Sequence, residues 1–112
     1  TRKSYKKIKR DTMKEYIYQQ YLNNICSHIG IESSDLFVKS KETGVVDGRQ
    51  LLYYLCYNNS NMKLTEISTY TGNQGFHEDQ ANISRSVESF TKKLESDKDL
   101  QAIVDKLKRV EV

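Results

Sequence analysis

The chain of 112 residues is long enough for one domain, and its 37% apolar content can fill one modest core but not two. It has no Pro, five Gly and 29% charged residues, which argues against a collagen, a flexible linker or a β-sandwich. No stretch approaches the ~18 consecutive apolar residues of a membrane span, and the N-terminus lacks the apolar run of a signal peptide. We therefore expect a helical protein of the cytoplasm, with no membrane partner.

The net charge of +3 is unevenly distributed. Residues 1–10 carry six basic groups and no acid, so the remaining chain has a net charge of −3. A basic run of this kind is typical of a flexible arm that contacts nucleic acid or an anionic surface. An equal alternative is a solvated tail that only aids solubility, or the trimmed end of a longer protein. We divide the chain into an arm, residues 1–10, and one helical domain, residues 11–112. Any DNA binding by the acidic domain would need a local basic patch.

Apolar residues recur at helical spacing in six segments, which predicts an all-α fold, a compact bundle of about six helices. Thr12 and Glu15 have the spacing of a capping box at the start of the first helix, and Gly30 ends it. Asp47 is the predicted N-cap of the third helix, and Gly72 the left-handed residue that closes the fourth. The six predicted helices begin near Asp11, Ser33, Asp47, Lys63, Asp79 and Ser96.

The fifth predicted helix is strongly amphipathic. Either Glu78 or Asp79 can cap it, and its opposite, polar face is available to a partner. The apolar stripe of this helix follows the spacing i, i+4, i+7, i+11 in Ile83, Val87, Phe90 and Leu94.

The sequence has no group of residues typical of a catalytic, nucleotide-binding or metal-binding site. Cys26 and Cys56 are far apart and lie in apolar stripes, so we interpret both as core thiols. The sequence has no phosphate-binding loop, dinucleotide fingerprint, zinc-binding His pair or nucleophile elbow. We therefore predict no catalytic residues, no cofactor and no metal.

The fourth and fifth predicted helices have the organisation of a helix-turn-helix, in which the second helix enters the major groove of DNA. Gln80 and Asn82 can each pair with adenine, and Arg85 can reach guanine or phosphate. Amides near a helix start also bind the local backbone, and an exposed Arg is common, so these residues alone favour an ordinary structural role.

Three groups of residues resemble motifs of a known protein family and occur in the same order as in that family. They are Ser34-Asp35-Leu36 followed by Gly48-Arg49-Gln50 and Leu51-Leu52-Tyr53-Tyr54-Leu55, then Leu64-Thr65-Glu66-Ile67 with Gly72, then Asp79-Gln80-Ala81-Asn82-Ile83. They resemble the Arg-Pro-Arg-Gln, Leu-Pro-Glu-Ile and Asp-His-Thr-Thr-Val motifs of the C-terminal DNA-binding domain of the bacterial replication initiator DnaA, a helix-turn-helix domain related in fold to the Trp repressor. The resemblance covers about two thirds of the chain.

The resemblance implies contacts for particular residues. Arg49 and Gln50 match family residues that contact phosphates, and Lys39 and Lys41 lie in the family's basic loop. The Arg that the family inserts into the minor groove falls here on Thr43. The family's His-Thr-Thr becomes Gln80-Ala81-Asn82, a later His aligns with Arg85, and the loop over residues 73–78 is longer. These departures argue against recognition of the initiator's own box sequence.

The 112 residues contain no counterpart of the initiator's ATPase domain. From the resemblance we therefore expect a free-standing or excised DNA-binding module of a phage, a mobile element or a regulator. The first hypothesis is a double-stranded DNA-binding domain whose phosphate contacts come from Lys39, Lys41, Arg49, Lys63 and the arm. The second is a protein-interaction module that keeps the fold, because residues 78–95 have a net charge of −1. A shared face for the basic residues would favour DNA, and scattering would favour a protein partner.

Overall fold

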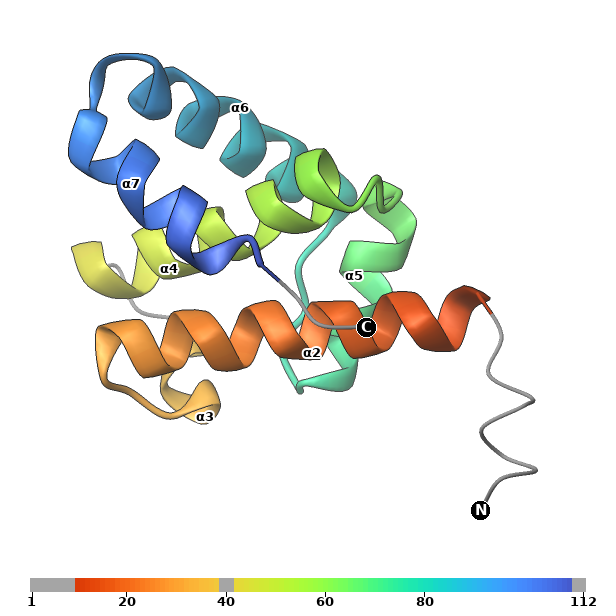
Figure 1. Ribbon diagram of the computed structural model, residues 1–112. Helices are drawn as coiled ribbons and strands as arrows, with labels where there is room; N and C mark the ends of the chain where they lie inside the picture. The colour runs from red at the N-terminus through yellow and green to blue at the C-terminus, as the bar shows by residue number, and fades with distance from the viewer. Residues whose placement is uncertain (1–9, 39–41, 110–112) are drawn as a thin grey trace.

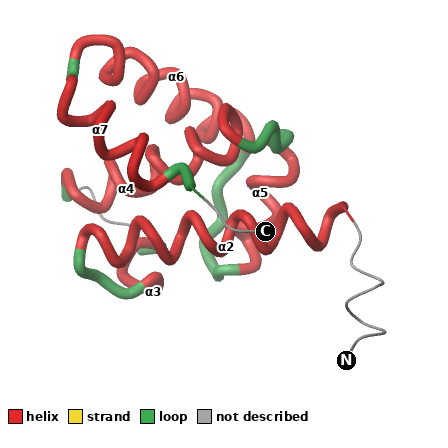
Figure 2. The backbone as a smooth tube through the Cα atoms, viewed as in Figure 1, coloured by secondary structure: helices red, strands yellow, loops and turns green. Residues whose placement is uncertain are grey.

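A computed structural model describes residues 10–38 and 42–109 of the chain (Figure 1). Within these ranges the fold is all-α, as predicted: six α-helices and one π-helical turn, joined by short loops and without a strand (Figure 2). The elements are α2 Arg10–Ile29, α3 Ser33–Leu36, α4 Thr43–Tyr54, η1 Leu55–Asn59, α5 Leu64–Asn73, α6 Gln80–Ser96 and α7 Lys98–Leu107. The predicted arm, but for Arg10, and the predicted phosphate contacts Lys39 and Lys41 lie outside the described residues.

The helix α4 is the centre of the bundle. It packs against α2 on one side and α6 on the other (Figure 1). The helices α5 and α7 each contact both α2 and α6. One apolar cluster joins all of them, and its fully buried members include Leu22, Ile25, Leu52, Leu55, Ile67, Ile83 and Phe90. Burial of side chains of this size stabilises by about 1.5–3 kcal/mol each, so the core holds the helices in one arrangement.

A close approach of α2, α3 and α4 depends on Gly48. A Cβ atom at this position would lie 2.8 Å from Leu36 Cδ1 and 2.9 Å from Ile29 Cδ1. The absence of a side chain therefore lets α4 pack directly on the other two helices.

Two predicted helix starts agree with the structure. Asp79 caps α6, because its carboxylate accepts a hydrogen bond from the Asn82 backbone N–H at 2.8 Å. Asp97 caps α7 in the same way, with Leu100 N at 3.0 Å. Each cap satisfies an N–H group that has no partner inside the helix.

Three predicted helix signals are wrong. The helix α4 begins at Thr43, so Asp47 lies inside it and its carboxylate binds Lys93 Nζ at 3.1 Å. Gly72 lies inside α5, and the left-handed residue is Gly75, with φ of +87°. Thr12 lies within α2, because that helix already begins at Arg10.

The prediction that both cysteines are core thiols is confirmed. Cys26 and Cys56 are buried free thiols, and burial is the main reason that the pKa of each is raised. In α4, Tyr53 is fully buried, and the half-buried Tyr54 packs against the core with its ring 5.0 Å from that of Phe90. In the described part of the chain, no helix is long and apolar enough to cross a bilayer.

Candidate nucleic-acid interface

The helices α5 and α6 pack against each other and are joined by a six-residue connection, Gln74–Asp79. The connection is longer than the three or four residues of a short helix-turn-helix. It is nevertheless held in place: Gly75 N donates to Gly72 O at 2.9 Å, and Ser68 Oγ donates to Glu78 O at 2.7 Å. The start of α6 is therefore fixed relative to α5.

A first depression, which we call the α6 groove, lies along α6 and is bordered by Gln50 of α4. It has a volume of about 360 Å³ and brings together three predicted site residues, Gln50, Asn82 and Arg85. Glu78, Ser86 and Ser89 complete its lining. The groove thus holds amide, hydroxyl and guanidinium groups, the types that read base edges and phosphates in DNA.

A second depression, which we call the α5 groove, lies at the N-terminus of α5. Its volume is about 570 Å³, and it contains two more predicted site residues, Lys63 and Gln80, both exposed. Tyr57 also lines it, with 42% of its surface exposed. An exposed Lys beside a helix N-terminus is a suitable contact for an anionic group.

Arg49 has a different environment from the other predicted contacts. Its Nη1 donates to Leu36 O at 2.7 Å and to Val38 O at 2.9 Å, and its guanidinium lies 5.0 Å from the centre of the Phe76 ring. Arg49 therefore holds the backbone at the end of the α3 segment, at Leu36 and Val38. The resemblance implied a phosphate contact and did not indicate this internal role.

Gln50 contacts a lysine of α6. Its Oε1 accepts a hydrogen bond from Lys93 Nζ at 3.0 Å, and the same nitrogen lies 3.1 Å from Asp47 Oδ1. Lys93 and Asp47 are each about half exposed, so their ion pair adds little to stability. The contact does place a lysine next to the α6 groove.

Asn82 and Arg85 belong to a chain of polar contacts that reaches the core. Tyr53 OH donates to Glu78 Oε1 at 3.1 Å, Asn82 Nδ2 donates to Glu78 Oε2 at 3.3 Å, and Arg85 Nη2 donates to Asn82 Oδ1. Burial and the Glu78 charge raise the pKa of Tyr53, which keeps its hydroxyl protonated as a donor.

The sequence did not indicate that Tyr53 and Glu78 take part in the site. Glu78 was interpreted only as one of two possible caps. No sequence signal indicated the contact of Glu78 with Asn82, because Glu78 precedes the Asp79 cap and the four-residue rule holds only for residues within a helix.

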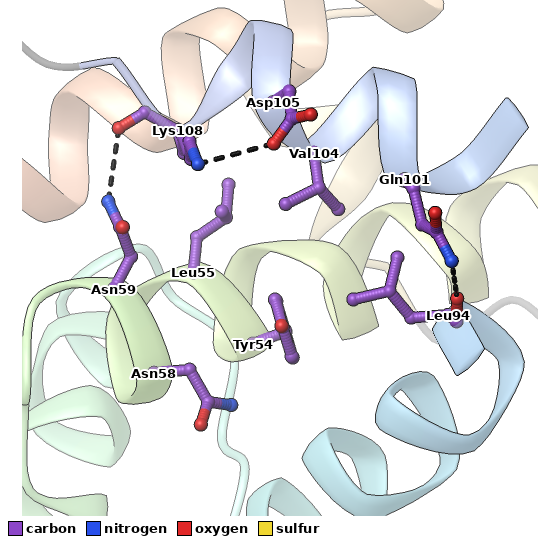
Figure 3. A pocket seen from close by; sticks show the side chains of 9 residues that line it. All are labelled: Tyr54, Leu55, Asn58, Asn59, Leu94, Gln101, Val104, Asp105 and Lys108. Carbon is purple, nitrogen blue, oxygen red and sulfur yellow. Dashed lines mark hydrogen bonds and ion pairs between the residues drawn. The ribbon is translucent and has the colours of Figure 1, made fainter. Parts of the chain in front are cut away.

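A separate pocket of about 220 Å³ lies between η1, the end of α6 and α7 (Figure 3). Much of its polar rim is bonded within the chain: Asn59 Nδ2 donates to Lys108 O at 3.1 Å, Lys108 Nζ lies 3.2 Å from Asp105 Oδ1, and Gln101 Nε2 donates to Leu94 O at 2.7 Å. It contains none of the predicted site residues. Among the described residues, no group of three or more His, Cys, Asp or Glu side chains could hold a metal ion.

The fold and the two grooves define an all-α domain in which a helix pair presents amides and cations at its surface. The chain is similar to chromosomal replication initiator proteins DnaA. It is 30% identical over 86 residues to the protein of Bacteroides thetaiotaomicron, an alignment that covers 77% of this chain and 17% of that protein. It is 28% identical over 108 residues to the protein of Bacteroides fragilis, covering 93% of this chain and 22% of that protein.

The chain therefore spans about a fifth of the length of the curated relatives it matches. No family model matches the chain. No solved structure matches it significantly.

Proposed function

We propose that this chain is a double-stranded DNA-binding module, related to the DNA-binding part of DnaA, in which α5 and α6 act as a helix-turn-helix. The observation that carries the proposal is the α6 groove, where Gln50, Asn82 and Arg85 meet beside a lysine. The similarity to two replication initiator proteins over most of the chain supports it.

In this proposal α6 enters the major groove. Its 17 residues span roughly 25 Å at 1.5 Å per residue, and its inner face is anchored by Ile83, Val87 and Phe90. The major groove admits a helix of this width. Arg85 and Gln80, both exposed on α6, are the proposed base contacts. Lys63 is the proposed phosphate contact.

The acidic residues near α6 are compatible with this orientation. Asp79 is occupied by the Asn82 backbone, and Glu78 by Tyr53 and the Asn82 amide. Acids are favoured at a helix N-terminus, where they offset the helix dipole. The local charge of −1 over residues 78–95 therefore includes two carboxylates that have partners within the domain.

The proposed setting is a phage, a mobile element or a bacterial regulator, acting in the cytoplasm without a catalytic role or cofactor. The basic arm would add contacts to the neighbouring DNA backbone, since six cations in ten residues attract any duplex.

The test is a titration of labelled duplexes with the full chain at two salt concentrations. Lys63→Ala should weaken binding to all duplexes alike and reduce the salt slope by about one ion. Lys106→Ala, which removes the same charge from α7 outside both grooves, should change binding much less.

A second variant has the five basic residues of positions 1–9 replaced by Gln, so that α2, which begins at Arg10, keeps its sequence. Retained binding with a base preference supports the proposal. Loss of all binding would show that only the arm attracts DNA, and the protein-interaction hypothesis would then be favoured.

A further inference from the structure

The polar chain from Tyr53 to Arg85 connects the interior of the bundle to its surface. Tyr53 is fully buried on α4, Glu78 and Asn82 are half-buried at the start of α6, and Arg85 is exposed one turn further along. Each member contacts the next by a hydrogen bond.

The chemistry of Glu78 fixes the orientation of the Asn82 amide. A carboxylate only accepts hydrogen bonds, so the NH₂ group of Asn82 faces Glu78 and its oxygen faces Arg85. Glu78 itself is held by Tyr53 at its side chain and by Ser68 at its backbone.

This orientation uses both ends of the Asn82 amide within the domain. Adenine is read by an amide that donates and accepts at the same time, and Asn82 would have to break two contacts to do so. Arg85 is in the opposite situation, because one contact orients a guanidinium that carries five N–H donors and is exposed.

We infer that Arg85 determines base specificity by reading a guanine, and that Tyr53, Glu78 and Asn82 are positioning residues that orient its guanidinium through hydrogen bonds. The inference rests on the proposed DNA-binding function and deepens it. A guanidinium pairs with the O6 and N7 atoms of guanine through two parallel hydrogen bonds, and a preset orientation reduces the entropy lost on binding.

The experiment is selection of bound sequences from a randomised duplex pool by the full chain, followed by titration of matched duplexes that differ at one base pair. Arg85→Ala should lower the preference for guanine at one position about tenfold. Asn82→Ala should lower the preference at the same position, because it removes the support of Arg85.

Glu78→Gln separates positioning from simple charge. The amide introduced by this substitution can accept from Tyr53 only by turning its NH₂ toward Asn82, which reverses the Asn82 amide and places its donors against Arg85. The guanine preference should fall about threefold to tenfold, which is no more than the loss expected for Arg85→Ala. Non-specific affinity should rise, because a negative charge is lost. Glu88→Gln, which removes an exposed carboxylate of α6, should raise affinity for all duplexes and leave the preference unchanged.

Tyr53→Phe removes a buried hydroxyl that DNA cannot touch, and it should reduce the guanine preference without changing the salt slope. Tyr18→Phe removes another buried hydroxyl, bonded to Thr71 instead, and should not alter the preference.

Three outcomes would overturn the inference. They are wild-type binding without a base preference, a preference that survives Arg85→Ala, and an adenine preference lost with Asn82→Ala at a position of its own. Each leaves the proposed function standing. Absence of duplex binding by the wild-type chain removes the proposed function, and the inference with it.

Discussion

Two polar contacts that cross the bundle differ in where they end. The contact between α2 and α5 is closed: Tyr18 OH and Thr71 Oγ1 lie 2.7 Å apart, and both residues are fully buried. The chain that starts at Tyr53 is open, because it ends at the exposed Arg85. Both use a tyrosine hydroxyl in the core.

The difference separates stability from binding. A closed contact has no alternative partner when one side is removed, since water cannot reach it, so its loss should appear in the free energy of unfolding. An open chain can exchange its last contact for water or a ligand at small cost. Its loss should appear in binding.

The largest effect is expected for Thr71→Val, which keeps the shape of the side chain and removes the hydroxyl. Burial raises the pKa of Tyr18, so its hydroxyl stays neutral and would be left buried without this partner. Unfolding in urea should show a loss of about 1–3 kcal/mol.

The double variant Tyr18→Phe/Thr71→Val removes both hydroxyl groups and should recover most of that loss, because replacing both partners by apolar groups is nearly neutral. Duplex binding should be unchanged in each variant. A single variant as stable as the wild type would show that the contact is not closed.

The next effect concerns Glu66, which also joins α5 to α2. Burial disfavours its charge, but hydrogen bonds from Lys63 N at 2.8 Å and Lys14 Nζ at 3.0 Å outweigh burial and lower the pKa of Glu66. A lowered folded-state pKa means that the stabilisation is complete above the unfolded-state pKa and is lost as the pH falls through the folded-state pKa.

Glu66→Gln should therefore cost about 1 kcal/mol at pH 7 and nothing at a pH below both pKa values. Urea titrations of both proteins from pH 7 into the acid range measure this convergence. Curves for Glu66→Gln and the wild type that stay parallel over this range would exclude the proposed linkage.

The sequence could predict some helix boundaries and not others. The boundaries of α6 were predictable, because the Asp79 cap and the apolar stripe are local signals that agree. The start of α4 was not predictable, because Thr43 and Gly44 have low helix propensity and are nevertheless helical in the structure.

The site was predictable in part. Residue types on one helix placed Asn82 and Arg85 together, and the α6 groove contains both. The hydrogen bonds that hold Asn82 in place were not predictable. They start from Tyr53, which binds Glu78 from 25 residues away in the sequence. The full burial of Tyr53 was not predictable either, because it depends on how α4 sits between α2 and α6.

A smaller effect is expected from two glycines that flank the end of α5. Gly72 lies inside the helix with open space around it, and Gly72→Ala should stabilise by about 0.5–1 kcal/mol. Gly75 has φ of +87°, and Gly75→Ala should cost about 1 kcal/mol. The urea midpoints of the two variants should move in opposite directions. Equal shifts would contradict the assignment of Gly75 as the left-handed residue.

The smallest change in stability is expected for Arg85→Ala, the open end of the second contact. The guanidinium is exposed and its partner Asn82 can bond to water instead, so the free energy of unfolding should change by no more than about 0.5 kcal/mol. The same protein sample should lose base preference, measured on matched duplexes. A large loss of stability would mean that the Arg85 contact stabilises the fold as the Thr71 contact does. A contact on which folding depends is not free to exchange with DNA.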